Sequence, residues 1–562
     1  MTDKRTVADV LSRLAFVHEL LDGEGQRGKT YAAASRTVWQ LEGDLAALHG
    51  SGALARVRGL GPSTLAVIGV VLGGATPDEL TALEAKLPPG LFELRRIKGL
   101  GPAKIRGLWK GLEITSLAEL EQACAENRLL ELSGFGKKTQ ENVARAIAEL
   151  RAHEGKLLRD GAMERMASLL GALRDAGISA RAVGGLVRGD ETIDRLEILV
   201  IGEVGPASEA LAKVGVAGAR LDGTKVVVHT ARAEDVGVAE LVHTSSPGHF
   251  GVLVAHAKAR GLTLSELGLS GAHGTIACAD AEAVYRAMEL SPTPAERRDE
   301  GVPLVGLGKI TPKLLELGDL RGALHNHTVA SDGSATLREM REAARRAGLT
   351  YLGITEHSQS ADYARGLTVE RLRAQEREIA DANASDPLAP TLLTGVESDI
   401  LADGALDYRD EDLASLEVVV ASGHRRFGLA RAETTARMIR AARHPRTDVM
   451  GHPTGRLLLG RPPNDFDMEA FLEACAQSGC AVELNGSPHR LDLSAEHLAM
   501  AKARGVLVSI AADAHATGEL DHLAHGVVIA RRAGLTAEDV LNARSLTELR
   551  SWLASRRARV LS

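Results

Sequence analysis

The sequence predicts a multidomain protein that begins with an all-α region, continues with an α+β region and ends with a β/α barrel. Its 562 residues are enough for roughly three or four domains. Gly-rich turns separate helical patterns up to about residue 150, whereas strand-like and helical runs alternate from about residue 320. Hydrophobic residues make up 44% of the chain and charged residues 25%, which is ordinary for a globular protein.

Three turns in the N-terminal region share an apolar–x–Gly–apolar–Gly pattern, and each opens a new amphipathic helical segment. They occupy residues 57–62, 97–102 and 132–137. Basic residues without an intervening acid accompany the second and third turns: Arg95, Arg96, Lys98, Lys104, Arg106 and Lys110, then Lys137 and Lys138. Tight turns need glycine for backbone reasons alone, so a single turn of this kind is weak evidence. The repeated turn with its basic residues favours DNA binding over a purely structural role.

The middle region, residues 155–300, mixes helical patterns with short strand-like runs at residues 196–200 and 225–229. Pro292, Pro294 and the charged run 296–300 predict a linker after it.

The C-terminal region alternates strand-like and helical runs, which is typical of a layered or barrel-shaped β/α domain. The predicted strands are residues 351–355, 391–395, 418–422, 449–451, 481–484 and 506–510. Active sites of such barrels lie where the strands end. Histidines and carboxylates cluster in the sequence at those ends.

Composition excludes several classes of protein. The net charge of −7 argues against a uniformly basic nucleic-acid binder but allows local basic surfaces. The four cysteines are spaced neither as a disulfide framework nor as a zinc knuckle, which favours a reducing cytoplasm. The first residues lack the apolar stretch of a signal peptide, and no run approaches the length of a membrane span. We therefore expect a cytoplasmic protein with no membrane partner.

The candidate metal-binding residues of the C-terminal region lie at its predicted strand ends. The segments are His325-Asn326-His327, Ser331-Asp332-Gly333, Thr355-Glu356-His357, Gly395-Val396-Glu397-Ser398-Asp399, Ser422-Gly423-His424, Gly451-His452-Pro453 and Asp513-Ala514-His515. Residues two apart in a strand share a face, so each His-x-His or Asp-x-His pair projects together. Imidazole and carboxylate without thiolate suit zinc, manganese or iron and disfavour a structural zinc site.

Nine candidate ligands exceed the needs of one ion and indicate two or three, with a carboxylate such as Glu397 as a bridge. Such a cluster lowers the pKa of a bound water and holds phosphate oxygens, which predicts phosphoester hydrolysis. The alternative is that these are unrelated surface or core histidines. It is reasonable for one residue such as His452, but not for a set at successive strand ends.

The motifs LHNHT, ITEHS, GVESDI, ASGHRRF, GHPTGR and ADAH resemble, in order, the ligand motifs of the PHP (polymerase and histidinol phosphatase) domain. The resemblance covers about residues 320–555 and implies a distorted barrel of parallel strands with a trinuclear metal site. The ligands it implies are His325, His327, Asp332, His357, Glu397, His424, His452, Asp513 and His515. Two neighbours depart from the usual pattern, Ala323 and Glu356, each where Asp is usual, but neither is a ligand.

We expect Glu397, Asp513, Arg456 and Asn485 to take part directly in hydrolysis. Arg456 and Arg490 could hold phosphate oxygens as bidentate donors, or could form surface salt bridges instead. Asn485 follows the strand at residues 481–484 and is a candidate for substrate contact.

With the Gly-x-Gly turns at the front, the whole chain resembles the bacterial family X DNA polymerases. The resemblance implies an N-terminal helical domain (1–80), a fingers-like domain (81–150), a palm and thumb (151–310) and a PHP domain (318–562). The turns match helix-hairpin-helix motifs, whose backbone amides bind DNA phosphates without reading sequence. The residues expected to contact DNA are Gly59, Gly61, Lys98, Gly99, Gly101, Lys104, Gly134, Gly136, Lys137 and Lys138.

The polymerase centre of this family is altered here. A Gly-Ser-x-Arg-Arg-Gly turn, a strand with Asp-x-Asp and a third Asp on a later strand are the family's pattern. In this chain Gly185 replaces the Ser, only Arg188 remains of the two arginines, and Arg195 and Glu197 stand at the Asp-x-Asp positions. The later strand, residues 225–230, carries no carboxylate. Two-metal catalysis needs facing carboxylates, so we predict no magnesium site in the palm and no polymerase activity.

The leading hypothesis is a DNA-binding, metal-dependent phosphodiesterase: a 3′–5′ exonuclease or 3′-end-processing repair enzyme acting on gapped, nicked or 3′ ends through two or three Mn, Zn or Fe ions. One alternative is an active family X polymerase with a proofreading PHP domain, in which Glu197 and one other acid hold the metal. Another is a non-catalytic scaffold for DNA ends. A third is a PHP domain that acts on small phosphate esters.

Overall fold

A computed structural model describes residues 4–23, 25–41, 45–425 and 428–561. The chain divides into two compact units, Met1–Glu154 and Gly155–Ser562. No helix in the described ranges combines the length and the apolar character that crossing a membrane requires. All four cysteines are buried and free, in agreement with the expected absence of a disulfide framework.

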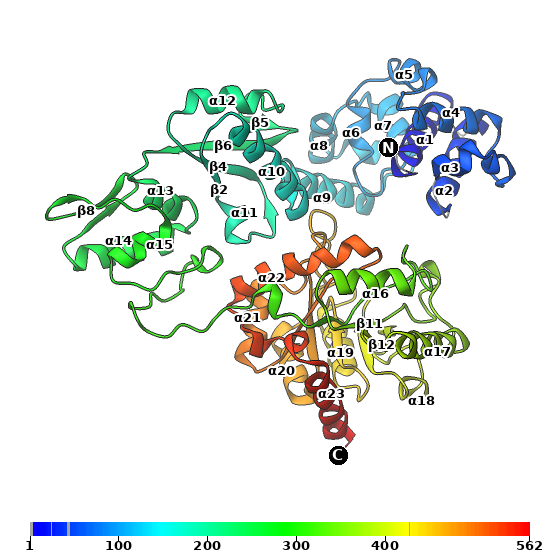
Figure 1. The fold of residues 1–562 in the computed structure, drawn as a ribbon. Coiled ribbons are helices and arrows are strands. Elements are labelled where there is room, and N and C mark those ends of the chain that lie inside the picture. Colours follow the sequence, from blue (N-terminus) through cyan, green and yellow to red (C-terminus); the bar gives the residue numbers. More distant parts are fainter. Residues whose placement is uncertain (1–3, 24, 42–44, 426–427, 562) are drawn as a thin grey trace. The chain divides into compact units, whose positions relative to one another are not determined.

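The first unit is all-α, as predicted, and a continuous apolar core runs through it from Val7 to Ile147. Its helices are α1 (Lys4–Asp22), α2 (Gln26–Gln40), α3 (Leu45–Gly50), α4 (Pro62–Leu72), α5 (Asp78–Glu84), α6 (Leu91–Leu94), α7 (Pro102–Leu112), α8 (Leu117–Ala125) and α9 (Lys137–His153), with 3₁₀ turns η1 (Ala53–Arg56) and η2 (Arg128–Glu131). Helices α4, α7 and α9 begin directly after the three Gly-x-Gly turns (Figure 1).

The second unit begins with a four-stranded sheet in the order β2-β4-β6-β5. Its strands are β2 (Ala180–Val183), β4 (Arg195–Ile201), β6 (Thr224–Ala231) and β5 (Arg220–Leu221), and β4 and β6 are parallel. Leu196, Ile198 and Val200 pack under α10 (Arg159–Asp175) and α12 (Val204–Ala212). Leu199 points to the other face, where α13 (Val236–His243) covers it. The alternation along β4 thus places helices on both faces of the sheet.

A smaller layer follows this sheet and has its own apolar core. It consists of α14 (Pro247–Ala259), α15 (Ala281–Ala287) and the strands β7 (Thr263–Ser265), β8 (Gly268–Gly271) and β9 (Gly274–Thr275). Short elements before it are β1 (Leu157–Leu158), α11 (Gly185–Arg188) and β3 (Thr192–Ile193).

The segment predicted as a linker is packed rather than free. Its charged run contains η3 (Ala295–Arg297) and pairs with the end of α22 (His522–Ala533). Arg531 Nε lies 2.7 Å from Glu296 Oε1, and Arg532 Nε lies 3.0 Å from Asp299 Oδ2. Opposite charges on a helix far along the chain thus hold this segment in place.

The C-terminal part forms a seven-stranded, wholly parallel sheet in sequential order, as the alternating pattern predicted. Its strands are β10 (Gly322–Ala323), β11 (Tyr351–Ile354), β12 (Thr391–Asp399), β13 (Val418–Ser422), β14 (Val449–Gly451), β15 (Ala481–Asn485) and β16 (Val508–Ala511). A parallel bridge between Asn326 and Ala514, with the His327 N–H donating to Ala514 O at 2.8 Å, joins the first and last strands. The sheet is therefore a nearly closed barrel.

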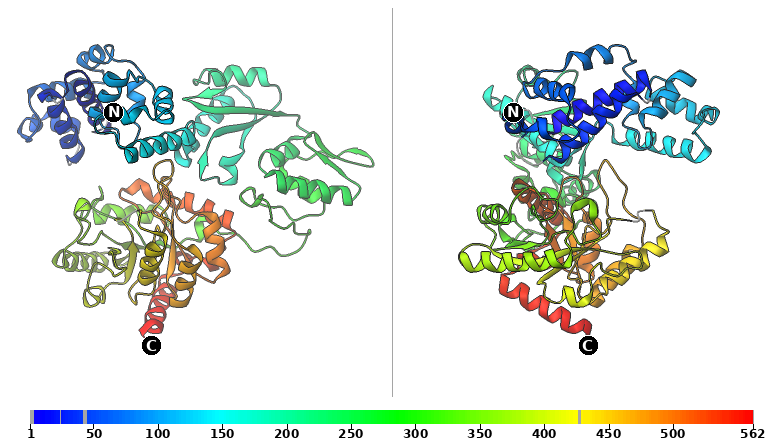
Figure 2. Two further views of the ribbon diagram at one scale, coloured as in Figure 1. Left: turned by 180° about the vertical axis from the view of Figure 1, so that it is seen from behind. Right: turned by 90° about the vertical axis from the view of Figure 1, so that its right-hand side faces the viewer.

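Both faces of this sheet are buried. Val418 and Val420 face the interior, which Leu549 and Leu553 of α23 (Leu546–Leu561) close. Val419 lies in the layer beneath the surrounding helices. Those helices enclose the strands in Figures 1 and 2 and are α16 (Leu337–Arg346), α17 (Val369–Ser385), α18 (Asp410–Leu413), α19 (Arg431–Ala442), α20 (Met468–Ser478), α21 (Ala495–Ala503) and α22. Short 3₁₀ turns complete this part: η4 (Leu317–Asp319), η5 (Asp362–Ala364), η6 (Thr517–Asp521), η7 (Ala537–Asp539) and η8 (Leu541–Ala543).

Candidate metal centre

The nine side chains singled out by sequence lie at the carboxyl ends of six barrel strands or in the loops directly after them. A parallel barrel brings these ends to one face. Within it, Glu397 belongs to β12, and His357, His424 and His452 follow β11, β13 and β14. The nine residues form four groups that share members. Within each group, the ligand atoms all lie within 4.8 Å of one another. The chain thus gathers the predicted residues in one place.

Glu397 lies at the middle of this cluster. Its Oε1 is 3.0 Å from His452 Nε2 and 3.1 Å from His424 Nε2. Its Oε2 is 2.8 Å from His357 Nδ1, and His325 Nε2 is 3.3 Å from Oε1. One carboxylate that reaches four imidazoles with two oxygens has the geometry expected of a bridging ligand.

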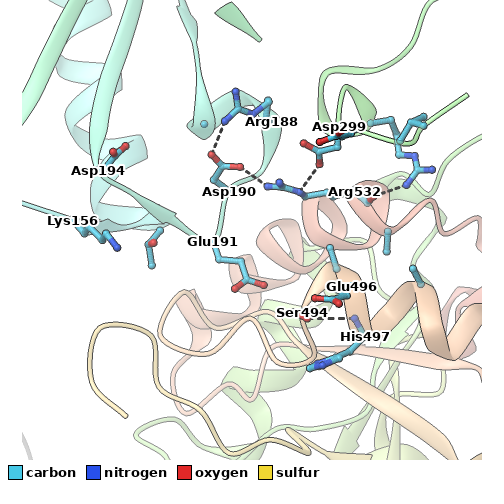
Figure 3. Close-up of a pocket in the computed structure, with 18 of the residues that line it drawn as sticks. Lys156, Arg188, Asp190, Glu191, Asp194, Asp299, Ser494, Glu496, His497 and Arg532 are labelled. Atoms are coloured by element: carbon cyan, nitrogen blue, oxygen red, sulfur yellow. Dashed lines mark hydrogen bonds and ion pairs between the residues drawn. The ribbon is translucent and has the colours of Figure 1, made fainter. Parts of the chain in front are cut away.

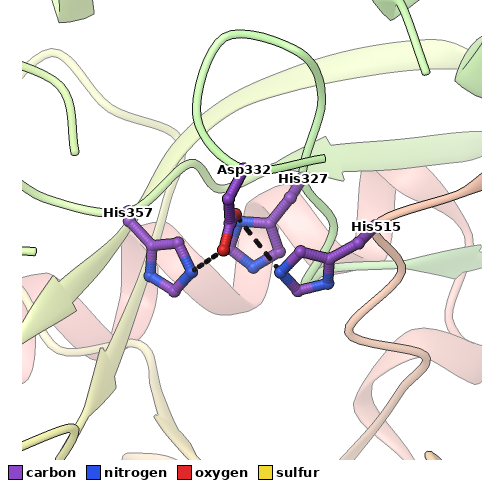
Figure 4. Close-up of side chains that lie close together, drawn as sticks. All are labelled: His327, Asp332, His357 and His515. Carbon is purple, nitrogen blue, oxygen red and sulfur yellow. Dashed lines mark ion pairs between the residues drawn. The ribbon is translucent and has the colours of Figure 1, made fainter. Parts of the chain in front are cut away.

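A second group lies around Asp332 and is drawn in Figure 4. The carboxylate of Asp332 stands between two imidazoles, 3.5 Å from His357 Nε2 and 3.3 Å from His515 Nε2. His327 completes the group. The side chains of Asp332 and His515 are 33% and 32% exposed, whereas that of Glu397 is 1% exposed. The centre therefore opens to solvent on the side of Asp332 and His515.

The hydrogen-bonding of these residues is incomplete without further partners. Among the described residues, the buried atoms without a hydrogen bond include His325 Nε2, both ring nitrogens of His327, His357 Nδ1, Glu397 Oε2 and His452 Nδ1. A buried polar group normally has a partner, because an unsatisfied one costs free energy. Neutral imidazole and carboxylate are also the donors that zinc, manganese and iron accept. The residues present therefore fit bound divalent ions.

The electrostatics of the cluster keep its carboxylates ionised. Burial alone raises the pKa of Glu397, but His424, His325 and His357 outweigh it and hold that pKa well below its usual range. Burial also lowers the pKa of His327 to about 3, so this imidazole is neutral. Burial also acts on His357 and His424, but Glu397 outweighs it and raises the pKa of His357 to about 10 and that of His424 to about 9. Metal binding would release these protons, because a ligating imidazole is neutral.

Two residues that sequence reasoning missed orient the ligands from behind. Glu483 Oε2 is 2.7 Å from His325 Nδ1, and its Oε1 accepts the His452 N–H at 3.1 Å. Asp399 Oδ1 is 2.5 Å from His424 Nδ1. Carboxylates that hold the second nitrogen of a ligating imidazole fix its tautomer and orientation. The signal available in the sequence was a single Glu within the apolar run at residues 481–484.

The unusual Glu356 holds the loop that carries Asp332. It is fully buried, accepts the Thr328 N–H at 3.0 Å and hydrogen-bonds to the Ser331 hydroxyl. Burial raises the pKa of Glu356. The departure from the usual residue therefore leaves the ligand set intact and serves to fix a loop.

Two ligands have backbone conformations that are rare for residues other than glycine. His452 has φ +24° and Asp513 has φ +51°. Such conformations cost free energy and persist where the surroundings fix them, often at functional sites. Both residues come shortly after a barrel strand, His452 after β14 and Asp513 after β16.

The three polar residues expected near the ligands are placed differently from one another. Arg490 Nε lies 3.6 Å from Asp513 Oδ2, and Arg490 Nη1 is buried without a partner among the described residues. Asn485 donates to Asp513 Oδ2 and to Glu483 Oε1, both at 3.0 Å, so its amide positions Asp513. Arg456 instead donates to Arg490 O and to Glu191 Oε1, at 2.9 and 2.8 Å.

Arg456 lines a separate cavity of about 990 Å³, shown in Figure 3. This cavity lies between residues of the four-stranded sheet region and residues of the barrel. Arg188, Asp190 and Arg532 form a chain of charges across it, with Asp190 3.0 Å from Arg188 and 2.5 Å from Arg532. Arg426 and Phe427, the last residues of the ASGHRRF motif, lie outside the described residues.

The residues expected at a lost polymerase centre lie at this cavity too: Gly185, Arg188, Arg195 and Glu197. On the paired strands β4 and β6, Arg195 is opposite Lys225 and Glu197 is opposite Val227. Arg195 Nε lies 3.3 Å from Asp194 Oδ1 and 4.0 Å from Glu197 Oε1. Two cations and a valine thus occupy positions around the one carboxylate of this strand pair.

The three glycine turns of the first unit have one geometry. Gly59, Gly99 and Gly134 have φ between +86° and +97°, and Gly61, Gly101 and Gly136 cap the following helices with extended backbone. The apolar residue between each pair is buried. A Cβ at Gly101 would meet nothing within 4 Å, and its φ of −76° suits any residue. Neither packing nor backbone strain therefore requires glycine at that position.

Comparisons with known proteins agree with this picture. Residues 92–149 match the family model described as a SAM-like helix-hairpin-helix tandem. The chain is 32% identical over 98% of its length, and 99% of the relative's, to the DNA polymerase/3'-5' exonuclease PolX of Bacillus subtilis (strain 168).

Smaller relatives match about two fifths of the chain. A probable phosphatase of Shewanella halifaxensis is 29% identical over 41% of this chain and 92% of its own length. Probable phosphatase TTE1963 of Caldanaerobacter subterraneus is 26% identical over 42% and 92%. The expected enzyme class, a metal-dependent phosphoesterase, is confirmed by these matches. With its barrel, its helix-hairpin-helix turns and a full-length relative, the chain belongs to the bacterial family X DNA polymerases that end in a PHP domain.

Proposed function

We propose that this protein is a DNA-binding, metal-dependent phosphodiesterase that removes or processes nucleotides at 3′ ends through its barrel. The observation that carries the proposal is the set of buried imidazole and carboxylate atoms around Glu397 that lie close together but include several that form no hydrogen bond. The ions would be held by His325, His327, Asp332, His357, Glu397, His424, His452, Asp513 and His515. Divalent ions in such a cluster, two or three of Mn, Zn or Fe, supply the Lewis acidity that phosphoester hydrolysis requires.

The residues of the chain itself would bind and orient the phosphate. Arg490 presents a buried guanidinium nitrogen without a partner among the described residues, beside Asp513. A guanidinium there would hold a phosphate oxygen and stabilise the charge that develops on it. Asn485 and Glu483 would act as positioning residues, because they hold Asp513 and His325. Arg456, engaged by Glu191 and a main-chain carbonyl, would not contact the substrate.

A residue at the mouth of the centre favours a nucleic acid as the substrate. Tyr363 is 63% exposed, and its ring centroid is 6.2 Å from that of His357 and 6.4 Å from that of His424. Arg425 lies over the same ring, 5.9 Å from its centroid. Exposed aromatic rings with an arginine nearby stack on bases of single strands. Tyr363 would therefore hold the base of the terminal nucleotide.

DNA binding would come from the helix-hairpin-helix turns of the first unit. Lys98, Lys137 and Lys138 are exposed at the second and third turns. Gly101 and Gly136 face open space, so a phosphate can reach the backbone amides at the starts of α7 and α9. Residues 1–80 and 81–150 would serve as the DNA-binding helical domains, 151–310 as the palm and thumb, and 318–562 as the hydrolase.

Polymerase activity would be lost in this chain. The support is the strand pair β4–β6, in which Lys225 and Val227 stand opposite Arg195 and Glu197. Magnesium ions for nucleotidyl transfer need several oxygen ligands, and cations at these positions repel them. Primer extension on a gapped template tests this point. We expect background extension for the wild type and for Arg195→Asp, because the facing position still lacks a carboxylate; extension by the wild type would contradict the loss.

The nuclease assignment is tested on DNA labelled at its 3′-terminal nucleotide in the presence of Mn²⁺. We expect release of the labelled mononucleotide by the wild type and by His444→Ala, a histidine outside the centre. His325→Ala combined with His327→Ala should abolish release. Full activity in that double variant would rule the assignment out. A protein purified under native conditions with almost no transition metal would favour a non-catalytic scaffold instead.

A second candidate is hydrolysis of small phosphate monoesters. It is favoured by the relatives named probable phosphatases, whose similarity covers the barrel part of the chain. The two functions separate when p-nitrophenyl phosphate and 3′-labelled DNA are compared at the same metal concentration. Faster turnover of the monoester would support the second candidate.

A further inference from the structure

Three side chains in the four-stranded sheet region form a second ligand group, far in sequence from the barrel residues. Glu197, His229 and His243 each offer one ligand atom, and these atoms all lie within 4.8 Å of one another. They come from β4, β6 and the last residue of α13. Each is partly buried. No sequence motif predicts this group, because its members come from three separate elements.

The topology explains why they meet. Strands β4 and β6 are parallel neighbours, with Leu199 opposite His229. Residues opposite each other, and residues two apart, point to one face of a sheet, so Glu197, Leu199 and His229 share a face. Val183 and Leu199 on this face pack against Val236 and Ala239 of α13, whose C-terminal residue is His243. Arg195 and Lys225, which lie opposite each other, share the face at the start of the two strands. The three ligand side chains therefore stand beside the apolar contact with α13.

The contacts among the three are close. His229 Nε2 lies 2.9 Å from Glu197 Oε2. The rings of His229 and His243 are stacked, with centroids 3.5 Å apart and planes 19° from parallel. A Cβ at Gly184 would lie 2.4 Å from Glu197 Oε1, so a glycine is needed to admit this carboxylate. The Gly184 N–H donates to His243 O at 3.0 Å, which fixes the end of α13 beside it.

A purely structural role would explain only two of the three side chains. Glu197 and His229 are joined by a hydrogen bond, but no described residue hydrogen-bonds to a ring nitrogen of His243, which stacks on His229. Burial, and then the neighbouring His229, lower the pKa of His243, so its ring is neutral and keeps a free lone pair near neutral pH. The two stacked imidazoles and the carboxylate together offer three ligand atoms.

We propose that Glu197, His229 and His243 form a binding site for a zinc-like divalent cation. Two imidazoles and one carboxylate are a ligand set that zinc accepts, whereas magnesium prefers oxygen ligands only. Two donors bound to one ion at about 2.0–2.1 Å are at most about 4.2 Å apart. The ligand atoms lie within 4.8 Å of one another, so small side-chain rotations would bring them onto one ion. The site would tie β4, β6 and α13 together.

The proposed site also faces the charged cavity. Glu197 lines that cavity together with Arg188 and Arg195. Three protein ligands leave a zinc ion with a fourth position, which water or an anion from the cavity can occupy. Arg195, whose Nε lies 4.0 Å from Glu197 Oε1, repels a cation at this site. The repulsion is reduced because the Arg195 side chain is 47% exposed and is paired with Asp194. The ion would occupy the place of the missing polymerase carboxylates without restoring their oxygen-rich environment.

The test counts zinc ions bound by the full-length protein. The wild type is stripped of metal by chelation, reloaded with Zn²⁺, freed of excess ion and analysed for zinc per chain. We expect His229→Gln combined with His243→Gln to hold one ion fewer than the wild type. His273→Gln, an exposed histidine of the same region, should hold as many as the wild type.

Folding is checked by circular dichroism and thermal unfolding of each variant. If the double variant is unfolded, His243→Gln alone is used, because it keeps the hydrogen bond between His229 and Glu197. We expect that variant to bind the palm ion at least tenfold more weakly. Equal zinc content and equal zinc affinity in the wild type and in a folded variant would overturn the proposal. The barrel ions do not confound the result, since none of these substitutions touches a barrel residue.

Discussion

The barrel and the four-stranded sheet region both carry their candidate site residues on parallel strands, but they differ in the side chains that surround the central carboxylate. In both, parallel strands deliver side chains to one place. In the barrel, Glu397 meets four imidazoles, and a second layer that includes Glu483 supports them. In the sheet region, Glu197 faces Val227 and has Arg195 beside it. The fold of each region is complete, because its apolar cores do not depend on the site residues. The proposed loss of polymerase activity would therefore leave the fold of the sheet region intact.

The largest expected effect comes from the bridging carboxylate. Glu397→Gln should lower the rate of 3′-nucleotide release about 10³-fold, because metal ions supply several kcal/mol of transition-state stabilisation. Single-turnover hydrolysis of 3′-labelled DNA in Mn²⁺ measures it. The comparison between the two regions fails if this variant keeps wild-type activity.

A smaller loss is expected from the second layer of the barrel. Glu483→Gln should reduce activity or metal affinity by about 10–100-fold, because the residue orients His325 and holds the His452 backbone. Hydrolysis is measured as a function of Mn²⁺ concentration. Glu473→Gln, an exposed glutamate on α20, is the matched control. Equal metal dependence in both variants would show that the second layer has no such role.

A substitution at the mouth of the barrel should change the hydrolysis of nucleic acid but not that of small phosphate esters. Tyr363→Ala is expected to slow hydrolysis of a single-stranded 3′ end about tenfold, since stacking on a base contributes about 1–3 kcal/mol. Hydrolysis of p-nitrophenyl phosphate should stay unchanged. Tyr363→Phe keeps the ring and should retain DNA hydrolysis. An equal loss on both substrates in Tyr363→Ala would mean that the ring supports the centre rather than the base.

The smallest effects are expected in the first unit, where two glycines of one turn differ. Gly99→Ala should lower the free energy of unfolding by about 1–2 kcal/mol, because its φ is +89°. Gly101→Ala, with ordinary φ and open space, should leave stability within about 0.5 kcal/mol. It should nonetheless weaken DNA binding several-fold. Denaturant unfolding and fluorescence anisotropy measure the two quantities; unchanged DNA affinity would leave this turn with a structural role only.

The sequence predicted most of what defines the barrel centre. Strand boundaries at residues 418–422 and 449–451 agree with β13 and β14. The nine ligand candidates converge because the ends of parallel strands meet and because a period of two aligns pairs such as His325 and His327. The local sequence pattern and the barrel topology therefore predict the same location for these residues.

What the sequence could not predict depends on contacts between distant elements. Glu483 is one carboxylate in an apolar strand, and its value lies in its contact with His325. His243 acquires a stacked partner only when α13 covers the sheet. The charged run at residues 296–300 was predicted only as a linker, because its partners on α22 lie far along the chain. A local pattern can single out a residue such as Glu483, but it does not identify the distant residue that it contacts.

Manganese-edge anomalous diffraction from crystals of the protein soaked in Mn²⁺ shows directly whether the barrel side chains bind a cluster of ions. We expect two or three anomalous peaks inside the barrel mouth, at least one of them in contact with Glu397 and another with Asp332. Crystals that show no peak among these side chains, at a Mn²⁺ concentration that supports DNA hydrolysis in solution, would contradict it.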